Sequence, residues 1–155
     1  MELENAQSAI EKLSIIKNIE CKCSICQRYC QQKPCWGTPE DIKKLIGSGY
    51  ANRLMLNYYT KTKGENVYFP SPAVKGYEGK PAPFWPGGIC TFYNFETGLC
   101  EIHTLKPLEG KTVYHESSEE NTHILIVSTW DTEDAQIVRV KWQEITGCRD
   151  LPHGF

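Results

Sequence analysis

Apolar residues along the chain recur mainly at the three- and four-residue spacing of helices. Near the start, Leu3, Ala6, Ile10, Leu13 and Ile16 alternate with Glu and Lys, which predicts an amphipathic helix over residues 2–19. Such a helix would either cap the core or pack on a partner chain.

The clearest helix start lies at Thr38-Pro-Glu-Asp. Thr38 can cap the helix, Pro39 suits the first helical position, and the two acidic residues complement the positive helix end. The apolar stripe Ile42, Leu45 and Ile46 predicts the buried face, and Gly47 and Gly49 its end. A further helix is predicted over Tyr50–Tyr59, with Leu54, Met55 and Tyr58 turned inward.

Residues 60–88 are rich in Gly and Pro, which predicts a long loop, and loops of this length are typically functional or wrap another part of the molecule. Its aromatic end around Phe84 and Trp85 would cover a site or line a substrate pocket. A hairpin is predicted over 90–100, with a three-residue turn at Glu96-Thr-Gly98 that places Asn94 opposite Cys100. Cys90 would then lie about 13 Å further along the strand, so it joins Cys100 only if the hairpin is shorter or curls.

The C-terminal segment 117–147 is predicted to be helical. Ser117-Ser-Glu-Glu120 forms a capping box, although the β-branched residues of 119–130 leave a strand as the alternative. A last helix opens at Asp131, with Val138, Trp142 and Ile145 on one face and Gly147 at its end. The predicted fold class is therefore mainly α with a small irregular β-hairpin.

Composition narrows the functional classes. The chain has 155 residues and a formal net charge of −2, so it fits a single domain over 1–155 and lacks the basic excess typical of nucleic-acid binding. It has no apolar run of membrane-spanning length. The acidic start lacks the basic region of a secretory signal peptide, so we expect a cytoplasmic protein in a reducing compartment.

Cysteine is the residue type that changes this picture. There are eight cysteines, and Cys21, Cys23, Cys26, Cys30 and Cys35 fall in one short stretch. Such density indicates either a metal site or a disulfide framework, and the expected reducing compartment favours metal. The spacing of Cys23, Cys26 and Cys30 points three thiolates at one volume, either from one helix face or from a chelating turn followed by a helix.

The order of these motifs resembles a known family. Cys23-x2-Cys26-x3-Cys30, then Cys90-Thr-Phe-Tyr, then Cys100-Glu-Ile-His-Thr-Leu-Lys-Pro107 resembles the YkgJ-like cysteine-cluster family, a zinc- or iron-chelating domain named for a CxxCxxCC motif. The resemblance covers about residues 21–110. It implies that Cys23, Cys26, Cys30, Cys90 and Cys100 are metal ligands. The chain departs from the family pattern at three places, where Tyr29 and Gly110 replace cysteines and His103 replaces a tyrosine.

The expected cofactor is Zn²⁺ or a 4Fe–4S cluster, because thiolates bind both. Cys35 is predicted to join the site and to compensate for a missing family cysteine, with Cys21 as another spare. His103 or His115 as the fourth ligand would favour zinc, whereas Cys148 is interpreted as a buried thiol. The alternative leaves position 110 as an open coordination position for water or substrate.

Two functions remain open from the sequence. The first is a metal-binding domain whose metal is mainly structural and whose protein or small-molecule partner is unknown. The second is an iron–sulfur enzyme in redox chemistry or protein methyl transfer. Some longer proteins that resemble the same family are described as protein methylases. The sequence contains no phosphate-binding loop and no nucleophile elbow. It therefore leaves open whether the chain is an enzyme.

Overall fold

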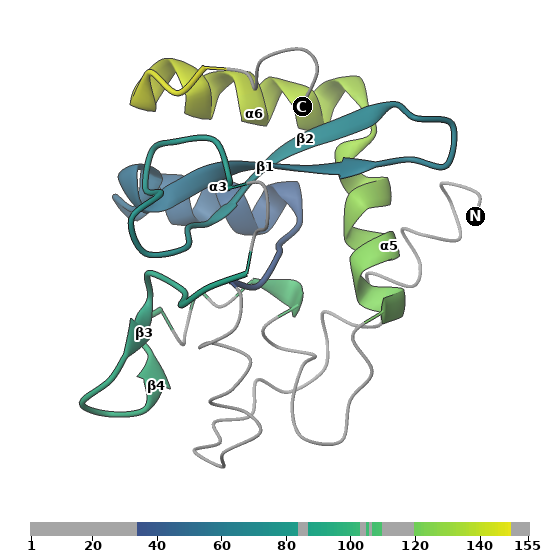
Figure 1. Ribbon diagram of the computed structural model, residues 1–155. Coiled ribbons are helices and arrows are strands. Elements are labelled where there is room, and N and C mark those ends of the chain that lie inside the picture. Colours follow the sequence, from purple (N-terminus) through teal and green to yellow (C-terminus); the bar gives the residue numbers. More distant parts are fainter. Residues whose placement is uncertain (1–33, 84–86, 103–104, 106, 110–119, 150–155) are drawn as a thin grey trace.

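The computed structural model describes residues 34–83, 87–102, 105, 107–109 and 120–149 (Figure 1). In these residues two small antiparallel sheets lie between helices in the chain order, so the fold class is mixed α/β and the prediction of a mainly α protein is wrong. The predicted helix 2–19 and Cys21–Cys30 lie outside the described residues. The described elements are α3 (Pro39–Gly47), the 3-10 helix η1 (Ala51–Arg53), β1 (Leu54–Thr60), β2 (Asn66–Pro72), β3 (Tyr93–Asn94), β4 (Leu99–Cys100), α5 (Glu120–Trp130) and α6 (Glu133–Thr146).

Helix α3 begins as its sequence predicts. The Thr38 hydroxyl accepts a hydrogen bond from the Asp41 N–H at 3.2 Å, and the Asp41 carboxylate accepts one from the Thr38 N–H at 3.0 Å. This reciprocal pair is a capping box, with Pro39 at the first helical position. Ile42 and Leu45 are fully buried, which confirms the predicted inward stripe for these two residues.

The predicted helix Tyr50–Tyr59 is wrong. Apart from the short η1, this segment forms β1, which pairs antiparallel with β2 from Leu54 opposite Pro72 to Thr60 opposite Asn66. The tyrosines and threonine of β1 suit a pleated surface better than a helix, and β2 supplies a partner that sequence periodicity cannot reveal. The predicted loop 60–88 is likewise partly wrong, because β2 lies in its first half.

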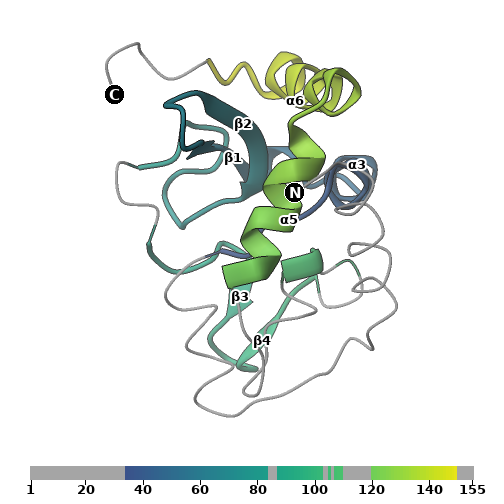
Figure 2. The same cartoon turned by 90° about the vertical axis from the view of Figure 1, so that its right-hand side faces the viewer.

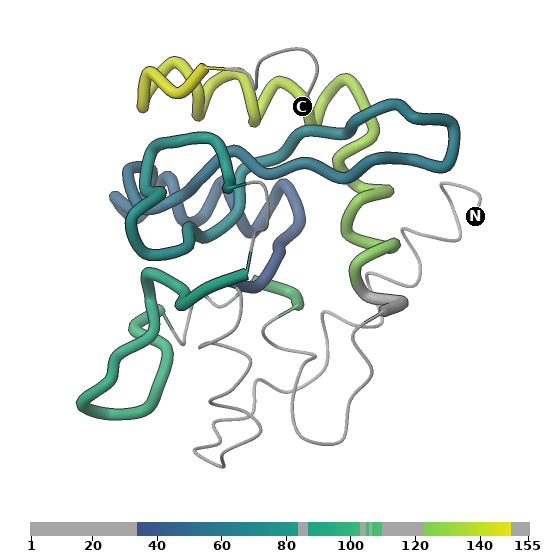
Figure 3. The backbone as a smooth tube through the Cα atoms, in the orientation of Figure 1, coloured from purple at the N-terminus to yellow at the C-terminus, as the bar shows by residue number. Residues whose placement is uncertain are grey.

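Two prolines fit inside β2 because of the register. Pro70 and Pro72 stand opposite Leu56 and Leu54, whose backbone groups point away from β2. Leu56 donates to the Lys80 carbonyl and accepts from the Ala82 N–H, and the Leu54 carbonyl accepts from the Gly79 N–H. The β1–β2 pairing therefore requires no N–H donor from either proline. Figure 3 traces the loop that returns from β2 to lie along the other edge of β1.

The two C-terminal helices are confirmed, and the strand alternative for 119–130 is wrong. Helix α6 is capped by the Thr132 hydroxyl, which accepts from the Ala135 N–H, and it ends at Gly147 in the left-handed region with φ of 74°. Val138 and Trp142 are buried as predicted, whereas Ile145 is 58% exposed and does not belong to the inward face. Among the described residues, no helix has the length and apolarity needed to cross a membrane.

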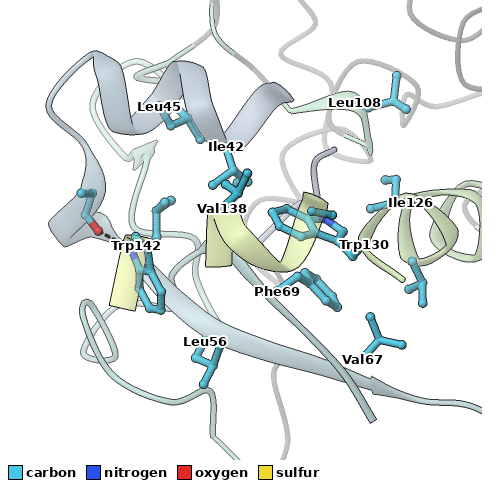
Figure 4. Close-up of a cluster of buried hydrophobic side chains, with 14 of the residues drawn as sticks. Ile42, Leu45, Leu56, Val67, Phe69, Leu108, Ile126, Trp130, Val138 and Trp142 are labelled. Carbon is cyan, nitrogen blue, oxygen red and sulfur yellow. Dashed lines mark hydrogen bonds between the residues drawn. The ribbon is translucent and has the colours of Figure 1, made fainter. Parts of the chain in front are cut away.

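The core lies between the strand pair and the helices. Helices α3 and α6 lie on the same side of β1–β2, with α5 beside them (Figure 2), and Figure 4 shows their apolar side chains meeting those of the strands. Two fully buried tryptophans tie this core to the chain entering α3 and η1. Trp130 donates its indole N–H to the Gly37 carbonyl at 2.8 Å, and Trp142 donates to the Ala51 carbonyl at 2.8 Å.

Asp41 does more than cap its own helix, because its carboxylate also accepts a hydrogen bond from the Leu108 N–H at 2.9 Å. We expect Asp41→Ala to lower the free energy of unfolding by about 2 kcal/mol, since two backbone donors lose their acceptor. Chemical denaturation with a far-ultraviolet circular dichroism readout measures the change. The control is Glu40→Ala in the same turn, which removes only an exposed ion pair to Lys43 and should cost less than about 0.5 kcal/mol. Equal losses in the two variants would contradict this role of Asp41.

Candidate metal centre

The structure describes three of the six predicted ligands. Cys35 and Cys100 are half-buried, and Cys90 is buried. Cys23, Cys26 and Cys30 lie outside the described residues, as do His103 and His115. Among the described residues alone, no three His, Cys, Asp or Glu side chains gather as a metal-binding group.

Cys90 enters the fold at the edge of the main core. It forms an isolated antiparallel bridge with Val74, flanked by hydrogen bonds from the Lys75 N–H to the Ile89 carbonyl and from the Thr91 N–H to the Ala73 carbonyl. The chain then turns, because the Tyr93 N–H donates to the Cys90 carbonyl at 3.0 Å. Cys90 is therefore not part of an extended strand running through to β3.

Cys100 lies on the second strand of the small hairpin β3–β4. The predicted register is wrong by one residue, since Asn94 pairs with Leu99 and Tyr93 pairs with Cys100. The Asn94 side chain accepts hydrogen bonds from the N–H groups of Glu96 and Thr97, which lengthens the turn to four residues. The strands are only two residues long and the chain turns at Cys90, so the separation expected from an extended hairpin does not apply.

A polar network fixes the segments that carry Cys90 and Cys100. Arg53 donates to the Thr91 carbonyl and to the Glu101 carboxylate, the latter at 3.0 Å, and it lies over the Phe92 ring. The Thr91 hydroxyl donates to Glu78 at 3.1 Å. The Arg53 guanidinium thus joins Thr91, which follows Cys90, to Glu101, which follows Cys100.

Glu78 is the acidic end of this network, and its pKa reflects the contacts. Burial raises the pKa, but the N–H groups of Glu78 and Gly76, the Thr91 hydroxyl and the Arg53 charge outweigh burial and hold the pKa below 4.5. The carboxylate is therefore stabilised in its charged form by the native structure.

Cys35 directly precedes Trp36, which is hydrogen-bonded to Glu109 in both directions. The Trp36 N–H donates to the Glu109 carboxylate at 2.9 Å, and the Glu109 N–H donates to the Trp36 carbonyl at 3.1 Å. Close packing at Gly37 continues this connection, because a Cβ there would lie 2.9 Å from the Cβ atoms of Asp41 and Pro107. The segment after Cys35 is therefore joined to residues 107–109.

The side chain of Glu109 is only 1% exposed, and His123 from the start of α5 faces it. The His123 Nε2 atom contacts the Glu109 Oε2 atom, and the imidazole stacks on the Trp36 indole with ring centroids 4.3 Å apart. Phe69 packs edge-on against the same indole at 5.0 Å. The buried carboxylate thus shares its oxygens between a backbone N–H and a histidine.

Sequence reasoning missed both Glu109 and His123. Glu109 follows the cysteine motifs without any spacing signal, and His123 lies in a segment interpreted only for its helical or strand propensity. Trp36 and Glu109 are separated by 73 residues, so only the tertiary structure brings them together.

Comparison of the chain with family models, with curated proteins and with solved structures gives no match.

The first prediction for this site concerns the stability of the fold at low pH. A carboxyl group with a lowered native pKa contributes stability that is present above its unfolded pKa and is lost as pH falls through its native pKa. The unfolding free energy of the wild type should therefore exceed that of Glu78→Gln most strongly above pH 4.5, and the gap should shrink at lower pH. Denaturant titrations at several pH values measure the gap. A gap that does not change with pH would contradict the role assigned to Glu78.

The second prediction concerns the buried pair. We expect Glu109→Ala to lower the free energy of unfolding by about 3 kcal/mol, because the partly buried His123 and the Trp36 N–H lose their partner. A double-mutant cycle with His123→Ala should give a coupling energy of about 1–3 kcal/mol. The matched cycle on the exposed Lys61–Asp131 pair should give a much weaker coupling, because solvent screens that pair. Additive losses at Glu109 and His123 would show that the two side chains are not energetically coupled.

Proposed function

We propose that this chain is a cysteine-cluster metal-binding protein that holds Zn²⁺ or an iron–sulfur cluster, and that the metal serves mainly to hold the fold together. The observation that carries the proposal is the spacing of Cys23, Cys26 and Cys30, which directs three thiolates to one centre. The resemblance to the YkgJ-like family remains part of the proposal and rests on the same cysteines together with Cys90 and Cys100.

The fold supports a structural role for the metal. Segment 88–102 is held by short strands, one isolated bridge and a surface-facing polar network, and it contributes few aliphatic side chains to the core. A metal centre that crosslinks this segment to the N-terminal cysteines would add the stability that such short elements lack. Structural zinc binding in small domains has an apparent free energy on the order of 10 kcal/mol and is coupled to folding.

The position of Cys35 supports its inclusion in the site. The residue after Cys35 is joined in both directions to Glu109, which directly precedes Gly110. Gly110 is the position at which the family pattern has a cysteine. Cys35 is therefore held near the chain position where a thiolate is missing, as a substitute ligand would need to be.

The iron–sulfur enzyme is the competing function, and it requires an iron–sulfur cluster, whereas zinc alone can fill the structural role. Purification under anaerobic conditions followed by metal analysis separates the two. A brown protein with iron and inorganic sulfide would favour the cluster, and a colourless protein with stoichiometric zinc would favour the structural role.

The ligand assignment is tested by replacement of single cysteines. Cys23→Ser, Cys26→Ser and Cys30→Ser should each lower the metal bound per chain, measured by elemental analysis of protein purified in parallel. Cys148→Ala is the matched control, because Cys148 is buried in the core at the far end of α6 and should leave the metal content unchanged. Full metal content in all three serine variants would overturn the proposed function.

A further inference from the structure

We propose that His123 is a further ligand of the metal centre, through its Nδ1 atom, and that the buried Glu109 carboxylate is the positioning residue that orients it. This inference rests on the proposed function for the thiolate ligands. It assigns the metal as zinc held by mixed sulfur and nitrogen ligands, rather than a cluster held by sulfur alone.

The contact between His123 and Glu109 determines which nitrogen can bind metal. The Nε2 atom faces a carboxylate oxygen, so Nε2 carries the proton of the neutral imidazole and Nδ1 carries the basic lone pair. Histidines that bind zinc commonly donate their other ring N–H to a carboxylate, which fixes the tautomer and makes the ligating nitrogen more basic. The Glu109–His123 pair has this chemistry, with the carboxylate 1% exposed.

Two further contacts orient the imidazole. The Trp36 indole stacks on the ring with planes inclined by 28°, which holds the ring plane in which the Nδ1 lone pair lies. The carboxylate is itself fixed, because its Oε1 atom accepts the Trp36 N–H at 2.9 Å. An imidazole restrained in plane and rotation is preorganised for a metal, so little ordering remains to oppose binding.

The location of the pair matches the gap in the cysteine pattern. Trp36 follows Cys35 in the chain, and Glu109 precedes the position where a family cysteine is missing. His123 contacts both Trp36 and Glu109, so its imidazole lies where these two chain positions converge. A nitrogen ligand at this place would close a site that has lost a thiolate, without use of position 110.

The first test uses the intact wild-type chain and so does not depend on the folding of a variant. The metal-free protein, labelled with isotopic histidine, is loaded with NMR-active cadmium as a spectroscopic substitute for zinc. We expect a scalar coupling between cadmium and the Nδ1 atom of one histidine, assigned to His123, whose Nε2 keeps its proton. Cadmium bound by cysteines without coupling to His123 would overturn this inference and leave the proposed function standing. Absence of cadmium binding would overturn both.

The second test compares variants by competition for zinc with a coloured chelator, after circular dichroism has verified that each variant is folded. His123→Ala should weaken zinc binding at least as much as Glu109→Gln, for which the loss is about 10- to 100-fold because only the orientation of the ligand changes. His153→Ala is the matched control, because no place in the site is assigned to His153, and it should retain wild-type affinity. Cobalt-loaded Glu109→Gln should also show shifted ligand-field bands, whereas a merely structural role of Glu109 would leave them unchanged. Wild-type affinity in folded His123→Ala would overturn the inference.

Discussion

A buried carboxylate sets the arrangement of this end of the molecule. A carboxyl group with 1% exposure is costly unless its oxygens have polar partners, and the partners of Glu109 are the Trp36 N–H and the His123 imidazole. These bonds bring together the segment before α3, the segment 107–109 and the start of α5. Gly37 and Asp41 bring the same segments together a few residues further on, because Gly37 admits Pro107 at close range and Asp41 accepts the Leu108 N–H.

The strand pair is the second constraint, and it works through backbone geometry. Two prolines in β2 would weaken an ordinary ladder, but here they face leucines whose backbone groups bond outward to residues 79–82. The same outward bonds cover one edge of β1 over part of its length, and the Asn57 side chain accepts the Tyr58 N–H further along that edge. Exposed strand edges invite pairing with other chains, so this coverage protects the hairpin as well as shaping it.

The two ends of the predicted cysteine site are fixed by different physics. Cys90 and Cys100 depend on the Arg53 network and on short strands, and the buried Phe92 and Tyr93 join their segment to the core. Cys35 is held by the buried Trp36–Glu109 connection, which is part of the core around Phe69 and Trp130. A metal that joined the two would crosslink segments that are far apart in the sequence, which is consistent with a metal in a structural role.

Elements that depend on local chemistry are specified by residues close together in the chain. The capping box of α3, the cap at Thr132 and the glycine end of α6 were predictable, because each is specified by neighbouring residues. The sequence also supplied the cysteine spacing, on which the proposed function still rests. It misassigned Leu54–Thr60, where apolar and aromatic residues fit a helix stripe and a buried strand alike.

Tertiary structure decided what depends on distant partners. A strand exists at β1 because β2 and residues 79–82 satisfy its backbone on both sides, and no local pattern encodes that pairing. The helical state of α5, despite its β-branched residues, is accompanied by burial of Ile126 and Trp130 against β2 and α6. The meeting of Glu109 with His123 is the clearest case, because a buried carboxylate acquires its chemistry from contacts across the fold and leaves no spacing in the sequence by which to find it.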